Sequence, residues 1–496
     1  MLTILDSFLN RLTMYRLLTY GLVGLVIISV GLSLTGALSM SVLGMALSLV
    51  LIGVGGFTTN QILARIWRIP LNEESGLLTA LILFFIMPTP TSVMTGALLV
   101  LAGAGAAASK FFLAYRGAHV FNPAAAAASA LGVVGLLHAS WWVGSAALWP
   151  FTLILGLLVV RKIRRFSLLF GFLAASLVVS IVTLLVNHSD LSTSLPVILV
   201  SSPLIFLGTI MLTEPSTMPA HRTEQVIFGV IVGALYSMHI SIGPVFVYPE
   251  VALLIGNLYA FAVSPKFHTK LRLREIQHIS DSVANYIFES LRRLAFQPGQ
   301  YMEWTLPGVG YNSRGNRRSF TIASSPTEST IQMGVKFYQP SSLYKQKLRA
   351  MKPGDTIVAG QVCGDFTLPR DPSRKVAMIA GGIGITPFRS MIQHQIDTQS
   401  NRDIVLLYSA RAEADLAYRD VFNQAKAHNV RSYFQASGSG QDRATTPEQL
   451  RKIIPDYAER VFYISGPPAM VESSHHSLRQ LGVAAHNIET DAFFGY

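Results

Sequence analysis

The feature that most constrains the fold of this chain is an abrupt change in charge density near residue 265. Residues 1–264 contain 7 acidic and 11 basic side chains, whereas the 232 residues that follow contain 20 and 28. Such a sparsely charged first part is typical of a bundle of membrane-spanning helices. The second part has the composition of a water-soluble protein. We therefore predict an α-helical polytopic membrane domain over residues 1–265, followed by a soluble module.

The first part contains about ten apolar segments. They lie at about 17–38, 41–64, 76–89, 91–109, 121–138, 141–160, 166–187, 195–213, 224–240 and 247–264. Several are shorter than the ~20 residues that span a bilayer, so we expect tilted, broken or re-entrant segments among them. Basic residues follow every second segment, which puts them on one face, and the positive-inside rule makes that face cytoplasmic. We expect a multi-pass protein of a bacterial-type inner membrane, without a cleaved signal, whose termini and soluble module are cytoplasmic.

Two pairs of stretches indicate an internal repeat in the membrane part. SGLLTALILFFIMPTPTS (75–92) resembles SSPLIFLGTIMLTEPST (201–217), and VFNPAAA (120–126) resembles FVYPEVA (246–252). Five segments separate the copies, and an odd number inverts the second copy relative to the first. Inverted repeats with proline-interrupted segments often place a binding site between the halves. Asn122 and Glu214 are the candidate residues of that site, because polar groups in apolar runs are costly; alternatively, they only satisfy the ends of broken helices.

The soluble part changes its pattern once. LRLREIQHISDSVANYIFE, PGQYMEWTL, RRSFTIASS, IQMGVKFY and DTIVAG are short strands separated by turn signals, which predicts a small antiparallel β-barrel over residues 266–372. From Lys375 the order becomes strand, glycine turn, helix and strand, in KVAMIAGGIGITPFRSMIQHQ, DIVLLYSAR and VFYISGPPAMV. This alternation predicts an α/β domain with a parallel sheet over residues 373–496.

Charge, cysteine and histidine usage limit the possible functions. The net charge of +12 does not indicate nucleic acid, because the basic residues of the first part are spaced as topology signals. The single cysteine, Cys363, excludes a disulfide framework and a self-contained Fe–S cluster. The candidate haem ligands are His119, His138, His188, His221 and His239. They lie at segment edges and are spaced more widely than paired axial ligands on one helix, which argues against haem. We assign no metal ligands.

RSFTIASSP (318–326) and three further stretches, in the right order over residues 268–496, resemble the ferredoxin–NADP reductase superfamily. In that family an Arg-x-(Tyr/Phe)-(Ser/Thr) strand holds FAD. The resemblance implies that Arg318 neutralises the flavin diphosphate, that Phe320 packs beside the isoalloxazine ring, and that Thr321 bonds the flavin near N5. The other FAD-binding residues that it implies are Ser319, Lys336, Ser341, Ser342, Gly364 and Phe366.

AGGIGITP (380–387) is a glycine turn between a strand and a helix, where backbone N–H groups and the helix dipole favour a diphosphate. The resemblance implies that it binds the nicotinamide dinucleotide through Gly381, Gly382, Gly384, Thr386 and Pro387. Ser409 and Arg411 would then border the adenosine ribose. Arg411 either accepts a 2′-phosphate or is simply solvated, so NADH and NADPH both stay open.

YISGPPAM (463–470) and the last residues complete the resemblance. In the family a cysteine usually precedes the Gly-Pro pair beside the nicotinamide; here that residue is Ser465. We take Thr321 and Ser465 as the residues of the hydride-transfer site. The other residues implied in this region are Gly466, Pro467 and Met470, and Phe493, Phe494 or Tyr496 as an aromatic cover for the flavin. The terminal aromatic residues could equally pack on the core.

The membrane part resembles the B subunit of the sodium-translocating NADH:quinone reductase and the D subunit of the Rnf electron-transport complex. The similar stretches are SGLLTALIL, HVFNPAAA, LTEPST and PEVALLIGNLYAF, over residues 75–265. Those relatives carry FMN on a threonine of a Ser-Gly-Ala-Thr type motif, which is absent here. No threonine is therefore assigned. A non-covalent flavin (FMN or riboflavin) or a quinone near the proline breaks is the expected acceptor.

These observations predict a membrane-bound enzyme that passes electrons from cytoplasmic NAD(P)H through FAD to a flavin or quinone in the membrane part. Further electron-transport subunits are compatible partners, and coupling to Na⁺ or H⁺ movement stays open. Two alternatives from other classes remain at this point. One is a haem-containing ferric reductase or oxidase, and the other is a transporter with a redox-sensing flavin module.

Overall fold

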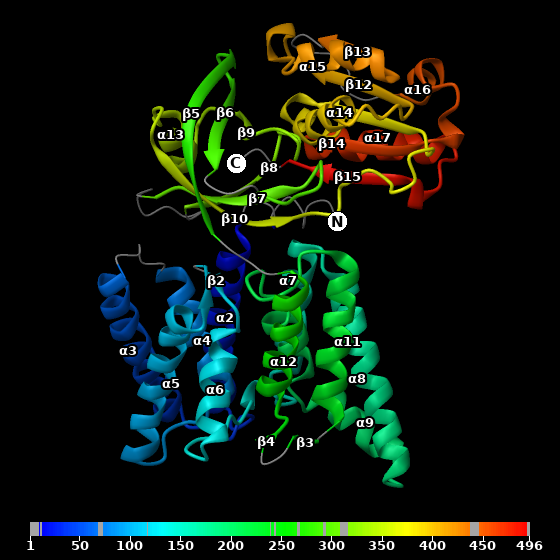
Figure 1. Cartoon of the computed structure of the whole chain (residues 1–496). Helices are drawn as coiled ribbons and strands as arrows, with labels where there is room; N and C mark the ends of the chain where they lie inside the picture. The colour runs from blue at the N-terminus through cyan, green and yellow to red at the C-terminus, as the bar shows by residue number, and fades with distance from the viewer. Residues whose placement is uncertain are drawn as a thin grey trace. The chain divides into compact units, whose positions relative to one another are not determined.

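A computed structural model describes residues 9, 12–67, 73–116, 118–238, 240–242, 245–264, 268–290, 294–307, 316–436 and 446–493. The chain divides into two units, Met1–Phe267 and His268–Tyr496. The first is helical and the second contains both large β-sheets (Figure 1).

The N-terminal unit has a helical piece in each predicted apolar segment. Its helices are α2 (Met14–Leu34), α3 (Val42–Trp67), α4 (Glu73–Ile86), α5 (Val93–Phe112), α6 (Pro123–Val133), α7 (Trp149–Ile163), α8 (Phe166–Val186), α9 (Leu191–Val200), α10 (Leu204–Phe206), the π-helix Leu207–Met211, α11 (Arg222–Met238) and α12 (Pro249–Val263). Two short hairpins, β1–β2 (Ala114–Tyr115, Ala118–His119) and β3–β4 (Ser241–Ile242, Val245–Phe246), lie between helices.

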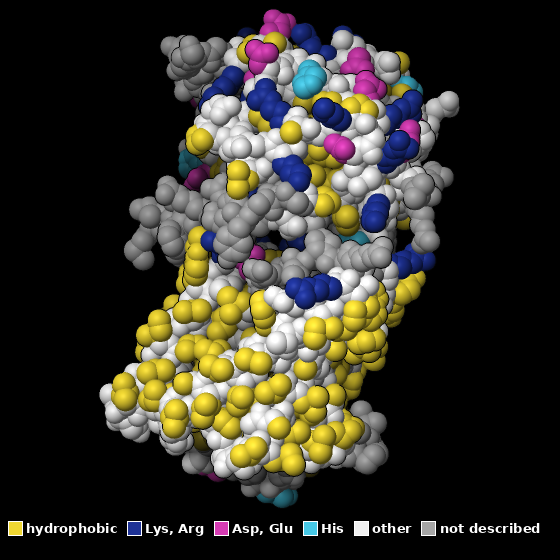
Figure 2. Space-filling view, turned by 90° about the vertical axis from the view of Figure 1, so that its left-hand side faces the viewer, with side chains coloured by type: hydrophobic (Ala, Val, Ile, Leu, Met, Phe, Trp, Pro, Cys, Tyr) yellow, Lys and Arg dark blue, Asp and Glu magenta, His cyan; other side chains and the backbone are white. Residues whose placement is uncertain are grey.

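Fewer of these helices are long enough to span a membrane than the ten segments suggest. Among the described residues four pass by length and composition, namely α2, α3, α5 and α8, and the bent pair α9 with Leu204–Met211 (48°) would be a fifth. At 1.5 Å per residue, α6 with 11 residues extends roughly 16 Å, about half of a bilayer core. Ten complete spans are therefore not confirmed. Apolar side chains spread over the surface of this unit, as a lipid-facing surface requires (Figure 2).

The short helices α6 and α12, both started by a proline, pack against each other inside the N-terminal unit. Asn122 caps α6 by accepting a hydrogen bond from the Ala125 N–H (3.0 Å), and its own N–H donates to Oδ1 of Asn257 on α12 (2.9 Å). The corresponding proline helices of the two sequence copies thus lie side by side. The inverted repeat itself stays a prediction.

The C-terminal unit begins with a six-stranded antiparallel sheet in the order β8-β7-β10-β5-β6-β9. Its strands are β5 (Thr269–Ser280), β6 (Val283–Ser290), β7 (Tyr301–Thr305), β8 (Arg317–Thr321), β9 (Thr330–Lys336) and β10 (Thr356–Cys363), with helix α13 (Leu343–Arg349) before the last. The two end strands are linked just beyond β8, where the Ala323 N–H donates to the Gln332 carbonyl (2.8 Å). The hydrogen-bonded ladder does not join β8 to β9, so a closed barrel stays a prediction.

The predicted parallel-sheet domain is confirmed. Its strands are β11 (Val376–Gly381), β12 (Ile404–Ala410), β13 (Val430–Ala436), β14 (Val461–Gly466) and β15 (Ile488–Ala492), all parallel in the order β13-β12-β11-β14-β15. Helices α14 (Thr386–Asp397) and α15 (Arg419–Gln424) cover one face, and α16 (Pro447–Ile453) and α17 (Pro468–Gln480) cover the other (Figure 1). The strand order reverses between β11 and β14, and in such sheets ligands bind at the carboxyl ends beside that reversal.

Candidate functional site

The glycine turn lies at this reversal. After β11 the chain makes a 3₁₀ turn, Gly382–Ile385, and enters α14 at Thr386 with Pro387 at its start. Gly382 has φ +55°, and no atom lies within 4 Å of the position that a Cβ would take. A Cβ on Gly384 would instead lie 2.4 Å from the carbonyl oxygen of Ser465 on β14. The backbone at 382 is therefore open to a ligand, while the turn packs directly on β14.

Ser465, the second-last residue of β14, lies opposite this turn. Its side chain is fully buried, and its Oγ finds no hydrogen-bond partner among the described residues. A buried hydroxyl left unpaired is costly, so a polar group of a ligand at this place would be stabilised. Met470 and Pro467 pack against Gly381. The Phe493 N–H donates to the Gly466 carbonyl (2.8 Å), which holds the C-terminal strand end beside the same motif. Phe494 and Tyr496 lie outside the described residues.

The predicted ribose-binding residues lie on the neighbouring strand. Ser409 is paired in register with Gly381, and its Oγ donates to the Ala380 carbonyl (3.2 Å). Arg411 follows at the end of β12 and is exposed. The structure thus brings Ser409 to the glycine turn and leaves Arg411 accessible to a ligand or to water.

Strand β8, the predicted FAD-binding strand, presents two of its predicted residues to one aromatic ring. The Arg318 guanidinium lies 5.1 Å from the centroid of the Tyr344 ring, and the Phe320 ring lies 6.1 Å from it. Ser319 between them is exposed, and Thr321 is buried at the strand end. Arg318 and Phe320 therefore share one side of the strand, as the alternation predicted.

A second cation, Lys345 on α13, lies near Arg318 and was missed by sequence reasoning. Its Nζ donates to the Lys336 carbonyl (2.8 Å) and lies 4.9 Å from the Tyr338 ring centroid. Burial, together with the positive charge of Arg318, lowers the pKa of Lys345 to about 8. A diphosphate bound here would relieve this repulsion, so the residues fit the anionic part of FAD. Nothing in the local sequence distinguishes Lys345 from a solvated lysine.

Five other predicted FAD-binding residues have defined contacts within the protein. The Ser341 Oγ donates to the Tyr338 carbonyl (2.7 Å), and Ser342 caps α13. Gly364 has φ +109°. Phe366 packs against Phe388 and Tyr463, and Lys336 forms an ion pair with Asp415 (2.7 Å). These contacts explain the residues structurally, and their roles in binding FAD stay predictions.

The N-terminal unit brings Asn122 and Glu214 together. The Asn122 Nδ2 donates to the Glu214 Oε2 (2.8 Å), the Thr217 Oγ1 donates to the same oxygen (3.3 Å), and the His119 Nε2 lies 3.4 Å from Oε1. Asn257, which sequence reasoning missed, completes the network by donating to the Thr217 carbonyl (3.3 Å). Residues from both sequence copies thus form one hydrogen-bonded cluster just after the π-helix.

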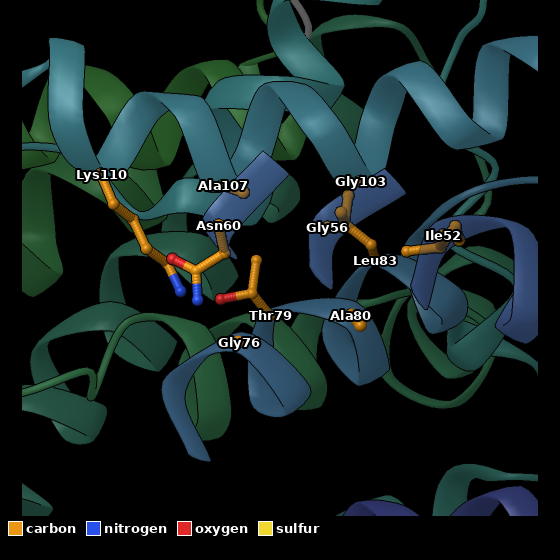
Figure 3. A pocket seen from close by; sticks show the side chains of 10 residues that line it. All are labelled: Ile52, Gly56, Asn60, Gly76, Thr79, Ala80, Leu83, Gly103, Ala107 and Lys110. Atoms are coloured by element: carbon orange, nitrogen blue, oxygen red, sulfur yellow. The ribbon is translucent and has the colours of Figure 1, made fainter. Parts of the chain in front are cut away.

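A second polar site in this unit was not predicted. Lys110 on α5 donates from Nζ to the carbonyl oxygen and Oγ of Ser75 (2.9 and 3.0 Å). Figure 3 shows Lys110, Asn60 and Thr79 directing polar side-chain atoms toward one cavity between α3, α4 and α5. Its volume is about 10 Å³, roughly the space of one water molecule. The sequence indicated Lys110 only as a topology signal, because the convergence of three helices is not visible in it.

Comparisons with known proteins concern mainly the C-terminal unit. The family model described as oxidoreductase NAD-binding domain matches residues 378–476. The chain is 27% identical over 209 residues to the glycine betaine monooxygenase reductase subunit of Chromohalobacter salexigens, covering 40% of this chain and 56% of that protein. It is 25% identical over 233 residues to the phenol hydroxylase P5 protein of Acinetobacter pittii, covering 44% and 64%.

Among solved structures, the FAD/NAD-binding domain of nitric oxide dioxygenase from Vibrio cholerae matches with 20% identity and a TM-score of 0.41, over 45% of this chain and 98% of that one. The chain spans about half to two thirds of the length of the curated relatives it matches. The family model and these relatives support a ferredoxin–NADP reductase-like FAD/NAD-binding module. The resemblance of the N-terminal unit to the two membrane subunits stays a prediction.

Proposed function

We propose that this protein is a membrane-bound NAD(P)H oxidoreductase that reduces FAD in its C-terminal unit and passes the electrons to an acceptor in its N-terminal unit. The observation that carries the proposal is the glycine turn Gly382–Ile385, packed on Ser465 where the strand order reverses. The cation pair Arg318 and Lys345 near the flavin strand supports it. The curated relatives, one of which is by name the reductase subunit of a monooxygenase, agree with this chemistry.

Each group of this chain then has a defined task. Arg318 and Lys345 would neutralise the flavin diphosphate, Phe320 would pack beside the ring, and the Thr321 hydroxyl would bond the ring near N5. The buried Ser465 hydroxyl holds the nicotinamide amide. FAD, when bound, supplies the ability to accept a hydride and to release electrons singly. The chain needs no general acid or base for the first step.

The acceptor in the N-terminal unit is a quinone or a non-covalent flavin, and the cavity beside Lys110 is the better candidate for its polar end. The Lys110 ammonium and the Asn60 amide can both donate to one carbonyl oxygen, which needs about the volume of one water molecule. The Thr79 hydroxyl donates to the Ser75 carbonyl (2.8 Å) and lines the same cavity. In the Glu214 cluster the side chains of Asn122, Thr217 and Asn257 are engaged in hydrogen bonds, whereas at the cavity the Lys110 ammonium keeps a third N–H beyond its two bonds to Ser75. The unit itself would lie in a bacterial-type inner membrane, with the C-terminal unit cytoplasmic.

The test is an absorption spectrum of the detergent-purified full chain before and after anaerobic addition of NADH or NADPH. We expect releasable FAD whose absorbance bleaches with one of the two nucleotides, and reduction of a dye acceptor. Flavin-free protein, or flavin that neither nucleotide bleaches, would contradict the proposal. A Soret band would instead support the haem-containing alternative for the N-terminal unit.

A further inference from the structure

We propose that Arg389 and Gly334 are positioning residues. They would set the spacing between β8, the proposed FAD-binding strand, and the glycine turn Gly382–Ile385. This inference rests on the proposed hydride transfer from NAD(P)H to FAD. Neither residue belongs to the predicted cofactor contacts. Both lie at the junction between the antiparallel sheet and the parallel-sheet domain within the C-terminal unit.

Arg389 connects α14, the helix that follows the glycine turn, to the segment that follows β8. It lies three residues after Thr386 on α14, and its side chain is 7% exposed. Its Nη1 donates to the Ala323 carbonyl (3.2 Å), two residues beyond Thr321. Both Nη atoms also bond the Glu328 carboxylate, with 2.9 Å between Nη2 and Oε1. Bidentate pairs of this kind fix orientation as well as distance.

Two further hydrogen bonds cross the same junction, one buried and one partly buried. The Ser390 Oγ donates to the Ser324 carbonyl (2.6 Å), and both residues are fully buried. The Tyr418 hydroxyl, whose ring lies 5.7 Å from the Arg389 guanidinium, donates to Oδ1 of Asn285 on β6 (3.0 Å). The junction therefore holds consecutive backbone carbonyls, at 323 and 324, directly on the first turns of α14.

Gly334 on β9 of the antiparallel sheet lies in close contact with the parallel-sheet domain. A Cβ at this position would lie 2.6 Å from the Tyr418 hydroxyl, 2.7 Å from Thr386 Cγ2 and 3.1 Å from Ile383 Cδ1. Its φ is not in the left-handed region, so glycine is needed here for space and not for backbone conformation. Ile383 lies in the glycine turn, and Thr386 is the first residue of α14 directly after it. One added methyl group must therefore push on these side chains, and Thr386, whose Cγ2 is bonded directly to Cβ, can yield only by changing its rotamer or by moving with its backbone.

The chemistry is sensitive to such a displacement. Hydride transfer requires reacting atoms about 3–3.5 Å apart, and a misplacement of about 1 Å can cost roughly 100-fold in rate. A purely structural junction would instead change stability and leave the transfer rate of the folded protein unaltered. The two roles can therefore be separated by measuring the rate, FAD content and thermal stability of the same variants.

The experiment is anaerobic stopped-flow reduction of the FAD-loaded full chain in detergent, using the nucleotide that bleaches the wild type. The variants are G334A and R389K, the latter keeping the charge but not the bidentate geometry. The matched controls are G360A, where a Cβ on β10 meets its neighbours at 3.4 Å, and R460K. Arg460 is a buried arginine of the parallel-sheet domain that pairs with Asp403 and Asp456.

We expect G334A and R389K to lower the limiting rate of flavin bleaching by about 10- to 100-fold, with FAD content unchanged. Their dissociation constants for the nucleotide should change less than the rate, and deuteration at nicotinamide C4 should slow the step further. G360A and R460K should keep the wild-type limiting rate, although R460K should melt earlier. If G334A does not retain FAD, R389K alone carries the test.

Variants at 334 and 389 that melt earlier but keep the wild-type limiting rate, as R460K does, would overturn the positioning role. A wild-type protein that neither NADH nor NADPH bleaches would contradict the proposed function itself. The two failures are therefore distinguishable.

Discussion

At the scale of single residues, neighbouring arginines on β8 differ completely in their surroundings. Arg317 bonds the Glu303 carboxylate (3.1 Å), whereas Arg318 lies over the Tyr344 ring. Successive side chains of a strand point to opposite faces, so only one of the two can face a given ligand. This pair provides a matched comparison on one strand.

We expect R318A to weaken FAD binding by roughly 30-fold, about 2 kcal/mol, because a charge-assisted contact to the diphosphate is lost. R317A should retain FAD, since it removes only a partly exposed ion pair with Glu303. Flavin content after gel filtration and titration of the apoprotein with FAD measure both. Equal loss of flavin in the two variants would show that Arg318 has no special role.

We expect the lowered pKa of Lys345 to make FAD binding pH-dependent. A diphosphate favours the charged lysine, whose pKa in the free protein is about 8. Affinity should therefore be constant below that pKa and weaken above it, by at most about tenfold per pH unit. In K345M this dependence should vanish. Fluorescence titrations with FAD at about pH 7 and about pH 9 test it, and a wild-type affinity that is the same at both values would refute it.

At the scale of secondary-structure elements, close backbone approaches determine two candidate sites. These are the nucleotide site at the glycine turn and the cavity beside Lys110. The glycine turn packs on β14 through Gly384. In the N-terminal unit, α3 packs on α5 through Gly55 and Gly103. Cβ atoms at the last two would lie 2.0 Å from the Val100 carbonyl oxygen and 2.1 Å from that of Ile52. Without side chains at these points, the helices approach closely enough to place Lys110 beside Asn60.

We expect G384A to abolish or strongly slow NAD(P)H-dependent flavin reduction while FAD content is retained. The added Cβ would lie 2.4 Å from the Ser465 carbonyl oxygen and 2.6 Å from the Gly466 backbone, so the turn must move from β14. Anaerobic bleaching and bound flavin are measured on the same sample. Normal bleaching in G384A would show that the turn does not hold the nicotinamide nucleotide.

K110M should separate the two half-reactions. Removing the ammonium should lower quinone reduction in proteoliposomes at least about tenfold, because a charged hydrogen bond contributes about 1.5–3 kcal/mol. Reduction of a water-soluble dye by NAD(P)H should stay unchanged. K162M, which removes a cation from the last turn of α7, is the matched control. Quinone reduction that survives in K110M but is lost in N122A would move the acceptor to the Glu214 cluster.

At the scale of the whole molecule, the chain joins a unit with an apolar surface to one with an FAD/NAD-binding module. Side chains as large as Phe170 and Leu34 are 75% exposed in the N-terminal unit. An apolar surface of this extent marks contact with lipid or a partner. The positive-inside pattern then predicts on which side of the membrane NAD(P)H is used.

We expect inverted membrane vesicles to oxidise NADH or NADPH with a dye acceptor, and intact spheroplasts to do so only after permeabilisation. Charged nucleotides do not cross the apolar core of a bilayer, so latency reports the side of the nucleotide site. Detergent should remove the difference between the two preparations. Full activity in intact spheroplasts would reverse the predicted orientation.

Part of this protein could be predicted from sequence because it depends on local patterns. The change of composition near residue 265, the helical pieces and the glycine turn between β11 and α14 all follow from charge, periodicity and turn chemistry. Only the tertiary structure determined how many helices are long enough to cross a membrane, because propensity does not locate helix ends. It alone placed Lys345 near Arg318, Asn60 beside Lys110 and Arg389 on Glu328, since these pairs are brought together by packing. Arg389 and Glu328 are 61 residues apart in the sequence, and no local pattern encodes a contact over that separation.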